Sequence, residues 1–199
     1  LLTLLMCSLS ACSTPGTWTS HPASNLMSNP IQTHISAQSQ ASRVRFVILH
    51  YTGGEQEASL KTLTEGGVSS HYLVGSVDGN VAGNDAAATI YRLVDENRMA
   101  YHAGDSSWKN FTQLNASSIG IEIVGLGFTE TPEGRQYFPY PAQQIDSVIA
   151  LLKDIVQRHQ IKPEYILGHA EIAPQRKVDP GPLFPWKTLA DAGLINWPD

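Results

Sequence analysis

A run of four consecutive apolar residues, Phe46 to Leu49, precedes His50 and, three residues on, a pair of glycines. Because alternate side chains of a strand point to opposite faces, such a run is typical of a strand buried on both faces of its sheet. Helices then cover both faces. The sequence therefore predicts an α/β domain with His50 at the carboxyl end of a central strand, where open α/β sheets bind their ligands. A buried histidine with a structural role is the alternative.

The spacing of apolar residues predicts the remaining elements. Residues 141–160 carry the clearest helical pattern, with one apolar stripe made of Ile145, Val148, Ile149, Leu152, Ile155 and Val156. A helix is also predicted over 55–65, with Ala58, Leu60 and Leu63 facing inward, and a short one over 189–194. Further strands are expected at 71–74, 89–94 and 165–167.

Residues 118–124, Ser-Ile-Gly-Ile-Glu-Ile-Val, form a second informative strand. Its three isoleucines point to one face, and Gly120, Glu122 and Val124 point to the other. A glutamate in such a run is costly to bury unless it is paired or lies near a metal. We expect Gly120 to leave open space beside it and Glu122 to line an active site. A structural ion pair is the alternative for Glu122.

The stretch 168–181 holds His169 and, ten residues later, Asp179, with Lys177 two positions before the aspartate. Two prolines and the terminal glycine predict an ordered loop rather than a helix or a long strand. In an extended segment Lys177 and Asp179 face one cavity, and Val178 faces away. A plain surface ion pair between Lys177 and Asp179 is the alternative.

His50, His169 and Asp179 together offer two imidazoles and one carboxylate. That set matches a zinc site with three protein ligands and a fourth position left open for catalysis. The spacing of these residues along the chain is loose, so it suggests the site without establishing it.

Composition restricts the possible partners further. The only two cysteines, Cys7 and Cys12, lie in the first twelve residues, so zinc in the folded domain must be held by histidine and carboxylate. The length of 199 residues fits one domain plus appendages. A net charge of −5 without a basic stripe argues against a nucleic-acid partner.

The amino-terminal segment has the composition of an export signal. Residues 1–11 are uncharged and apolar but too short to span a bilayer, which predicts the hydrophobic part of a secretory signal. The sequence from Leu9 to Cys12 resembles the cleavage box of bacterial lipoproteins, in which the cysteine is acylated. We expect residues 12–42 to be a lipidated cysteine and a disordered tether, and residues 43–199 to be the folded domain. An ordinary signal peptide with an incidental cysteine is the alternative.

Aromatic residues surround another histidine of the domain. His102 follows Tyr101 and precedes two small residues, and Trp108 lies nearby in the chain. Flat aromatic faces pack on sugar rings, so these residues predict a groove for a saccharide or a peptide. Packing in the core is the alternative for Trp108.

Five short motifs occur in order along the chain: His50-Tyr51-Thr52, Tyr101-His102-Ala103-Gly104, Ser118-Ile119-Gly120-Ile121-Glu122, Gly168-His169 and Lys177-Val178-Asp179-Pro180-Gly181. In this order they resemble the motifs of the zinc-dependent type 2 N-acetylmuramoyl-L-alanine amidases, a family that includes phage endolysins and animal peptidoglycan recognition proteins. The resemblance runs over residues 43–197, and residues 83–88 read as an insertion that departs from it. With the lipoprotein box, the likeness points to the outer-membrane lipoprotein amidase of Gram-negative bacteria.

The resemblance implies a single domain with a central mixed β-sheet flanked by helices. It also implies that His50, His169 and Asp179 hold one zinc ion, that Glu122 is the general base, and that Lys177 stabilises the oxyanion. By the same likeness, His102 and Trp108 are candidate substrate contacts.

The implied reaction is hydrolysis of the amide bond between N-acetylmuramic acid and L-alanine, in peptidoglycan or in muropeptides released from it. We expect a monomer held at the outer membrane by lipid on Cys12 and facing the periplasm; Ser13, which follows that cysteine, is typical of this address. The alternative is a non-catalytic module that binds peptidoglycan. A zinc peptidase acting within the stem peptide is disfavoured because no H-E-x-x-H motif is present.

Overall fold

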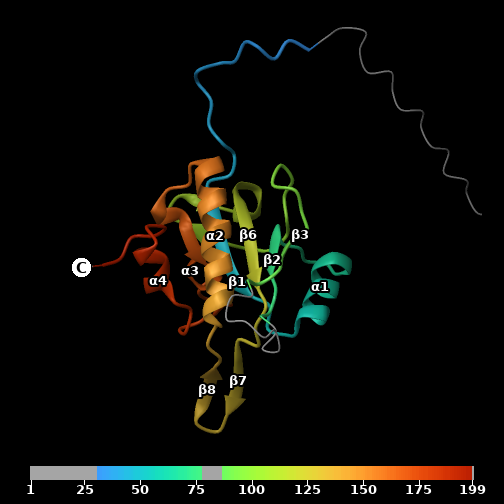
Figure 1. Ribbon diagram of the computed structural model, residues 1–199, viewed down its shortest axis with the longest axis vertical. Helices are drawn as coiled ribbons and strands as arrows, with labels where there is room; N and C mark the ends of the chain where they lie inside the picture. The colour runs from blue at the N-terminus through green and yellow to red at the C-terminus, as the bar shows by residue number, and fades with distance from the viewer. Residues whose placement is uncertain (1–30, 78–86, 199) are drawn as a thin grey trace, which may run out of the picture. The chain divides into compact units, whose positions relative to one another are not determined.

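Five strands form the main sheet, in the order β3-β2-β6-β1-β9. They are β1 (Phe46–Tyr51), β2 (Tyr72–Val74), β3 (Ile90–Arg92), β6 (Ser118–Ile123) and β9 (Ile166–Gly168). Neighbouring strands run parallel except β3, which pairs antiparallel with β2. The sheet is therefore mixed, and β6 and β1 lie at its centre as their apolar sequences predict (Figure 1).

The computed structural model describes residues 31–77 and 87–198. The chain divides into two units, residues 1–40 and 41–199. In the described part of the first unit, residues 31–40, the side chains are exposed and no helix or strand forms. The expected signal at 1–11, Cys12 and most of the 83–88 insertion lie outside the described residues, so these expectations stay predictions.

One face of the sheet is covered by α2 (Ala142–His159) and α4 (Trp186–Asp191), and α2 lies in front of the sheet in Figure 1. Alternate residues of the two central strands pack there: Val47, Leu49, Ile119, Ile121 and Ile123. The predicted stripe of α2 is confirmed in the main, but Leu151 is buried while Ile149 is only half-buried. The closing helix begins earlier than predicted and ends before Leu194.

The other face of the sheet carries Phe46, Ile48 and His50 on β1. Two short helices pack on the first two of these residues, the 3-10 helix η1 (Leu114–Ser117) and α3 (His169–Ile172). Over β2 the same face is covered by α1 (Gln56–Glu65), which ends at Gly66. The prediction for the inward face of α1 is confirmed at Leu63, which is buried, but not at Ala58, which is exposed while the neighbouring Ser59 is buried.

The single turn of α3 corrects the prediction of a loop at this place. Ala173 donates its N–H to the carbonyl of His169 over 3.0 Å, and the Glu171 carboxylate accepts the N–H of Gly168 over 2.7 Å. A side chain that satisfies an amide at the start of a helix stabilises its first turn, even where prolines follow.

Two hairpins and one further 3-10 helix lack a clear local signal in the sequence. The hairpins pair β4 (Ser107–Trp108) with β5 (Phe111–Thr112), and β7 (Phe128–Thr131) with β8 (Gly134–Tyr137); the 3-10 helix is η2 (Pro163–Tyr165). Among the helices of residues 31–77 and 87–198, none combines the length and the apolar character needed to cross a membrane.

Candidate metal centre and active site

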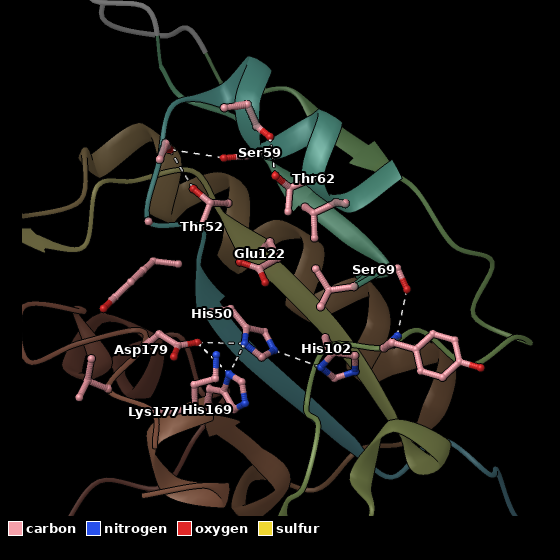
Figure 2. A pocket seen from close by; sticks show the side chains of 18 of the residues that line it. His50, Thr52, Ser59, Thr62, Ser69, His102, Glu122, His169, Lys177 and Asp179 are labelled. Carbon is pink, nitrogen blue, oxygen red and sulfur yellow. Dashed lines mark hydrogen bonds and ion pairs between the residues drawn. The ribbon is translucent and has the colours of Figure 1, made fainter. Parts of the chain in front are cut away.

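Three side chains from distant parts of the chain meet at the carboxyl ends of the central strands. Nδ1 of His50 lies 2.9 Å from Nδ1 of His169 and 3.0 Å from Oδ2 of Asp179. Nδ1 of His169 lies 3.1 Å from the same carboxylate oxygen. All three residues are buried, and Figure 2 shows them pointing toward one another. The structure thus brings together the three residues that the sequence suggests as ligands.

The register of the sheet places two of these residues and Glu122 side by side. His50 on β1 is paired with Glu122 on β6, and Leu49 is paired with Gly168 on β9. His169 follows Gly168 directly and therefore emerges beside His50. Parallel strands end at the same edge of a sheet, so three separated motifs reach one place without any long loop.

Asp179 is brought back onto this edge by the loop after α3. Its carbonyl accepts the N–H of Ala170 over 2.8 Å, so the loop lies against the start of α3. A Cβ at Gly168 would stand 2.8 Å from Cδ of Pro180, which is too close. Glycine is therefore required where this loop packs against β9.

The donor atoms around the cluster fit a zinc ion. Nε2 of His169 faces the carbonyl oxygen of Ala103 at 3.1 Å and must donate to it, which leaves a lone pair on Nδ1. The three candidate ligand atoms lie within 4.8 Å of one another. Two imidazole nitrogens and a carboxylate oxygen that converge in this way match zinc with one position open.

Burial keeps the cluster in the protonation state that a metal requires. Burial lowers the pKa of His50 to about 4, although Asp179 opposes the shift. Burial alone would raise the pKa of Asp179, but the neighbouring imidazoles of His169 and His50 hold it well below its usual range. A neutral imidazole beside an ionised carboxylate is ready to bind a cation near neutral pH.

Glu122 stands beside this cluster with an unusual carboxyl group. Its Oε2 is buried and has no hydrogen-bond partner among the described residues. Burial and the negative charge of Asp179 raise the pKa of Glu122 to about 8, with Lys177 acting in the opposite direction. A carboxyl whose pKa lies near neutrality can both take and return a proton.

Lys177 also reaches the site. It is partly buried and lines the same cavity as Asp179, as the alternation along the loop predicts. Val178 between them lines this cavity too and a second cavity on the other side of the loop, so it does not simply face away.

The cavity above the cluster has a volume of about 630 Å³ and mixed polar and apolar walls. Hydroxyl groups of α1 and neighbouring loops line one side, among them Thr52, Ser59, Thr62 and Ser69 (Figure 2). Phe128 and Arg135 line it from the β7–β8 hairpin, with the guanidinium 4.4 Å from the centre of the ring. These two residues are not predictable from the sequence, because no local pattern indicates where a hairpin lies relative to a distant strand.

The two candidate substrate contacts lie in different places. His102 is 8% exposed and lines the cavity, but its ring nitrogens lie 3.1 Å from Nε2 of His50 and 3.1 Å from Oγ of Ser118. Trp108 is not among the residues that line this cavity; it packs against the core and borders the second cavity. The structure therefore does not bring Trp108 to the cluster.

The expectation of open space beside Gly120 is wrong. A Cβ at Gly120 would stand only 2.4 Å from Cγ of His102, so the imidazole fills the space that the glycine leaves. Gly120 thus serves the packing of a histidine behind His50 rather than the entry of a ligand.

Comparison with known proteins extends these findings. The family model for N-acetylmuramoyl-L-alanine amidase matches residues 40–182. The chain is 44% identical over 169 residues to N-acetylmuramoyl-L-alanine amidase AmiD of Escherichia coli, covering 85% of this chain and 60% of AmiD. It is 34% identical over 97 residues to 1,6-anhydro-N-acetylmuramyl-L-alanine amidase AmpD of Enterobacter cloacae, covering 49% of this chain and 47% of that protein.

Solved structures show the same likeness. The complex of E. coli AmiD with anhydro-N-acetylmuramic acid-L-Ala-D-gamma-Glu-L-Lys matches with a TM-score of 0.78, covering 85% of this chain and 65% of that one at 44% identity. AMPDH3 from Pseudomonas aeruginosa, in complex with an anhydromuramic pentapeptide, matches with a TM-score of 0.75, covering 87% and 68% at 38% identity. The chain spans about 60% of the length of AmiD.

Proposed function

The chain belongs to the N-acetylmuramoyl-L-alanine amidase family, and from this premise we propose that it is a zinc-dependent hydrolase of the amide bond between N-acetylmuramic acid and L-alanine. The observation that carries the proposal is the convergence of His50, His169 and Asp179 beside the unpaired carboxyl of Glu122. Hydrolysis of an amide needs an electrophilic centre and a base close together, and both are available at this edge of the sheet.

His50 and His169 through their Nδ1 atoms, and Asp179 through a carboxylate oxygen, would hold the zinc. Zinc in such a site supplies a Lewis acid that polarises a carbonyl group and activates water. The protein contributes a rigid frame, because two of the ligands stand on or beside paired strands of the sheet.

Glu122 and Lys177 divide the remaining chemistry. We expect Glu122 to take a proton from the attacking water and to pass it to the nitrogen of the leaving amine. The ammonium of Lys177, which lines the same cavity as Glu122, offsets the negative charge that develops on the carbonyl oxygen.

The substrate class follows from the cavity and from the relatives. The solved AmiD and AMPDH3 complexes contain anhydromuramic acid joined to a peptide. The cavity of this chain is large enough for a sugar and part of a peptide, and its polar walls can bind hydroxyl and amide groups. We propose muropeptides and peptidoglycan as substrates on these grounds.

The test is digestion of purified peptidoglycan and of a defined anhydro-muropeptide by zinc-loaded protein, with mass spectrometry of the products. Release of stem peptides with a free L-alanine amino terminus supports the amidase. Sacculi that are bound but unchanged would instead indicate a binding module, and cleavage within the peptide would indicate a peptidase.

Attachment to the outer membrane through lipid on Cys12, facing the periplasm, is a separate proposal. It rests on the apolar residues 1–11 and the lipoprotein-like cleavage box that ends at Cys12. Replacing Cys12 by serine should release the protein from the membrane fraction. A variant that stays in that fraction would contradict the anchor without affecting the proposed reaction.

A further inference from the structure

A chain of hydrogen bonds behind His50 has only one possible direction. It begins at the carbonyl of Leu114, which lies 2.6 Å from the hydroxyl of Ser118. A carbonyl oxygen cannot donate, so Ser118 uses its single proton in this bond. Ser118 then has only lone pairs to offer to Nε2 of His102, 3.1 Å away, and Nε2 must carry the proton of that ring.

The direction continues from His102 to His50. A neutral imidazole carries one proton, so a ring protonated at Nε2 has a lone pair at Nδ1. Nδ1 of His102 lies 3.1 Å from Nε2 of His50, which must therefore donate. His50 is left with its lone pair on Nδ1, the atom that faces His169 and Asp179. Each link follows from the one before it.

We infer that Ser118 is a positioning residue for the metal site, which selects, through His102, the tautomer of His50 that presents the Nδ1 lone pair to the metal. The inference rests on the zinc centre of the proposed function and adds a residue that is two hydrogen bonds away from the ligand His50. Ser118 itself is buried and touches neither the cavity nor the cluster.

The backbone around His102 supports this arrangement. The side-chain oxygen of Asn115 accepts the N–H groups of His102, over 3.1 Å, and Ala103, over 2.7 Å. Gly120 leaves the space in which the His102 ring fits. The carbonyl of Ala103 also accepts a hydrogen bond from Nε2 of His169. One dipeptide therefore orients both imidazoles, His50 through a side chain and His169 through a carbonyl.

Removal of the Ser118 hydroxyl should weaken zinc binding in a specific way. Without it, the proton on Nε2 of His102 has no acceptor, which favours the tautomer protonated at Nδ1. That proton would face Nε2 of His50 and would favour a His50 protonated at Nδ1, which cannot bind zinc. Zinc binding must then shift His50 back to the tautomer protonated at Nε2, and the free energy of this shift weakens the binding. Loss of such outer partners typically lowers metal affinity about 10–100-fold, and we expect about tenfold for a residue at this distance.

Ser147 offers a matched control. It is also buried, it also donates to the carbonyl four residues before it, and it accepts one hydrogen bond, from the N–H of Ala88 over 2.9 Å. It lies on α2, which covers the face of the sheet opposite the cluster. Ser147→Ala should therefore cost folding stability as Ser118→Ala does but leave zinc affinity unchanged.

The experiment measures zinc affinity of the full chain by competition with a chelator, for wild type, Ser118→Ala, Ser118→Thr and Ser147→Ala. The ¹⁵N chemical shifts of the zinc-loaded proteins report which nitrogen of each imidazole is protonated. We expect about tenfold weaker zinc binding and an altered His102 signal in Ser118→Ala alone. Ser118→Thr, which keeps the hydroxyl, should restore both.

Two results would overturn the inference: zinc affinity of Ser118→Ala equal to that of wild type, or an equal loss in Ser147→Ala. The first would mean that the tautomer is set elsewhere, and the second that zinc binding follows general stability. Since zinc affinity is measured without substrate, a wild type that binds zinc in the expected way but cleaves no amide would refute the proposed reaction and leave this inference standing.

Discussion

Two groups of histidine and carboxylate in this molecule have similar contact distances between their side chains but differ in their balance of hydrogen-bond donors and acceptors. The central group is His50, His169 and Asp179, with contacts of 2.9 to 3.1 Å. The outer group is Glu96, Arg158 and His159, where Nε2 of His159 lies 2.6 Å from Oε2 of Glu96 and Nη2 of Arg158 lies 2.8 Å from Oε1. Distance alone does not distinguish the two.

The balance of donors and acceptors does distinguish them. In the outer group, Arg158 and the hydroxyl of Tyr72 both donate to Glu96, so the carboxylate is satisfied within the protein. In the central group three acceptor atoms converge, and the N–H of His169 is directed away toward Ala103. A satisfied group stabilises the fold, whereas an unsatisfied set of lone pairs requires a cation. Among the described residues, only the central group has the arrangement of a metal site.

The largest expected difference between the two groups comes from replacing one histidine of each group by alanine. His169→Ala should lose stoichiometric zinc, and turnover should fall by more than about 10³-fold, because a site with two protein ligands no longer holds the metal. His159→Ala should keep both. Zinc content by elemental analysis and hydrolysis of a defined muropeptide measure the two effects. Full zinc in His169→Ala would contradict the assignment of ligands.

Glu122→Gln tests whether the site has a base distinct from its ligands. Its shape is retained but it cannot accept a proton, so turnover should fall about 10²–10⁴-fold while zinc content is unchanged. The measurement is single-turnover hydrolysis together with zinc stoichiometry. If the Glu122→Gln enzyme stayed active, another group would have to be the base.

Lys177→Ala should reduce kcat by about 10²–10³-fold if the ammonium stabilises charge in the transition state. KM should change less than kcat, since the developing charge is absent from the bound substrate. Steady-state kinetics with a soluble muropeptide separate the two constants. A rise in KM alone would instead assign Lys177 to substrate binding.

Glu122 also predicts how stability depends on pH in the zinc-free protein. Its pKa is raised from 4.5 to about 8, so the folded state keeps a proton that the unfolded state releases. Stability from this group is therefore lost as pH rises from 4.5 toward 8, by at most about 1.4 kcal/mol per pH unit. Glu122→Gln should be increasingly more stable than wild type over this range. Urea unfolding with a chelator at several pH values measures the difference, and a constant difference would show that Glu122 is ionised when folded.

Local sequence patterns predict the frame of this site well. The apolar runs of β1 and β6 are long enough to identify central strands, and strand ends identify where His50, Glu122 and His169 emerge. Contacts between residues on different segments were harder to predict from the sequence. Nothing near Gly120 in the chain indicates that its missing side chain makes room for His102, eighteen residues earlier.

Residues that act through contacts at long range were missed for the same reason. Arg135 and Phe128 reach the cavity only because the β7–β8 hairpin folds toward it, and hairpin orientation depends on packing rather than on local pattern. In the sequence, Ser118 is an ordinary first residue of a strand, yet in the structure its hydroxyl donates its proton to the carbonyl of Leu114. Motifs thus predict which side chains carry chemistry, whereas the structure shows which side chains contact them.

The smallest expected effect belongs to the outer group and completes the comparison. Burial alone would raise the pKa of Glu96, but hydrogen bonds from Arg158, His159 and Tyr72 lower it to about 2. Its stabilisation is therefore present above pH 4.5 and is lost as pH falls toward 2, the opposite of Glu122. Because Arg158 is partly exposed and solvent screens the pair, Glu96→Gln should cost only about 1 kcal/mol at neutral pH. Urea unfolding at pH 7 and pH 3 should show that this cost shrinks in acid, while zinc affinity stays at its wild-type value; a loss of zinc in Glu96→Gln would mean that the two groups are coupled.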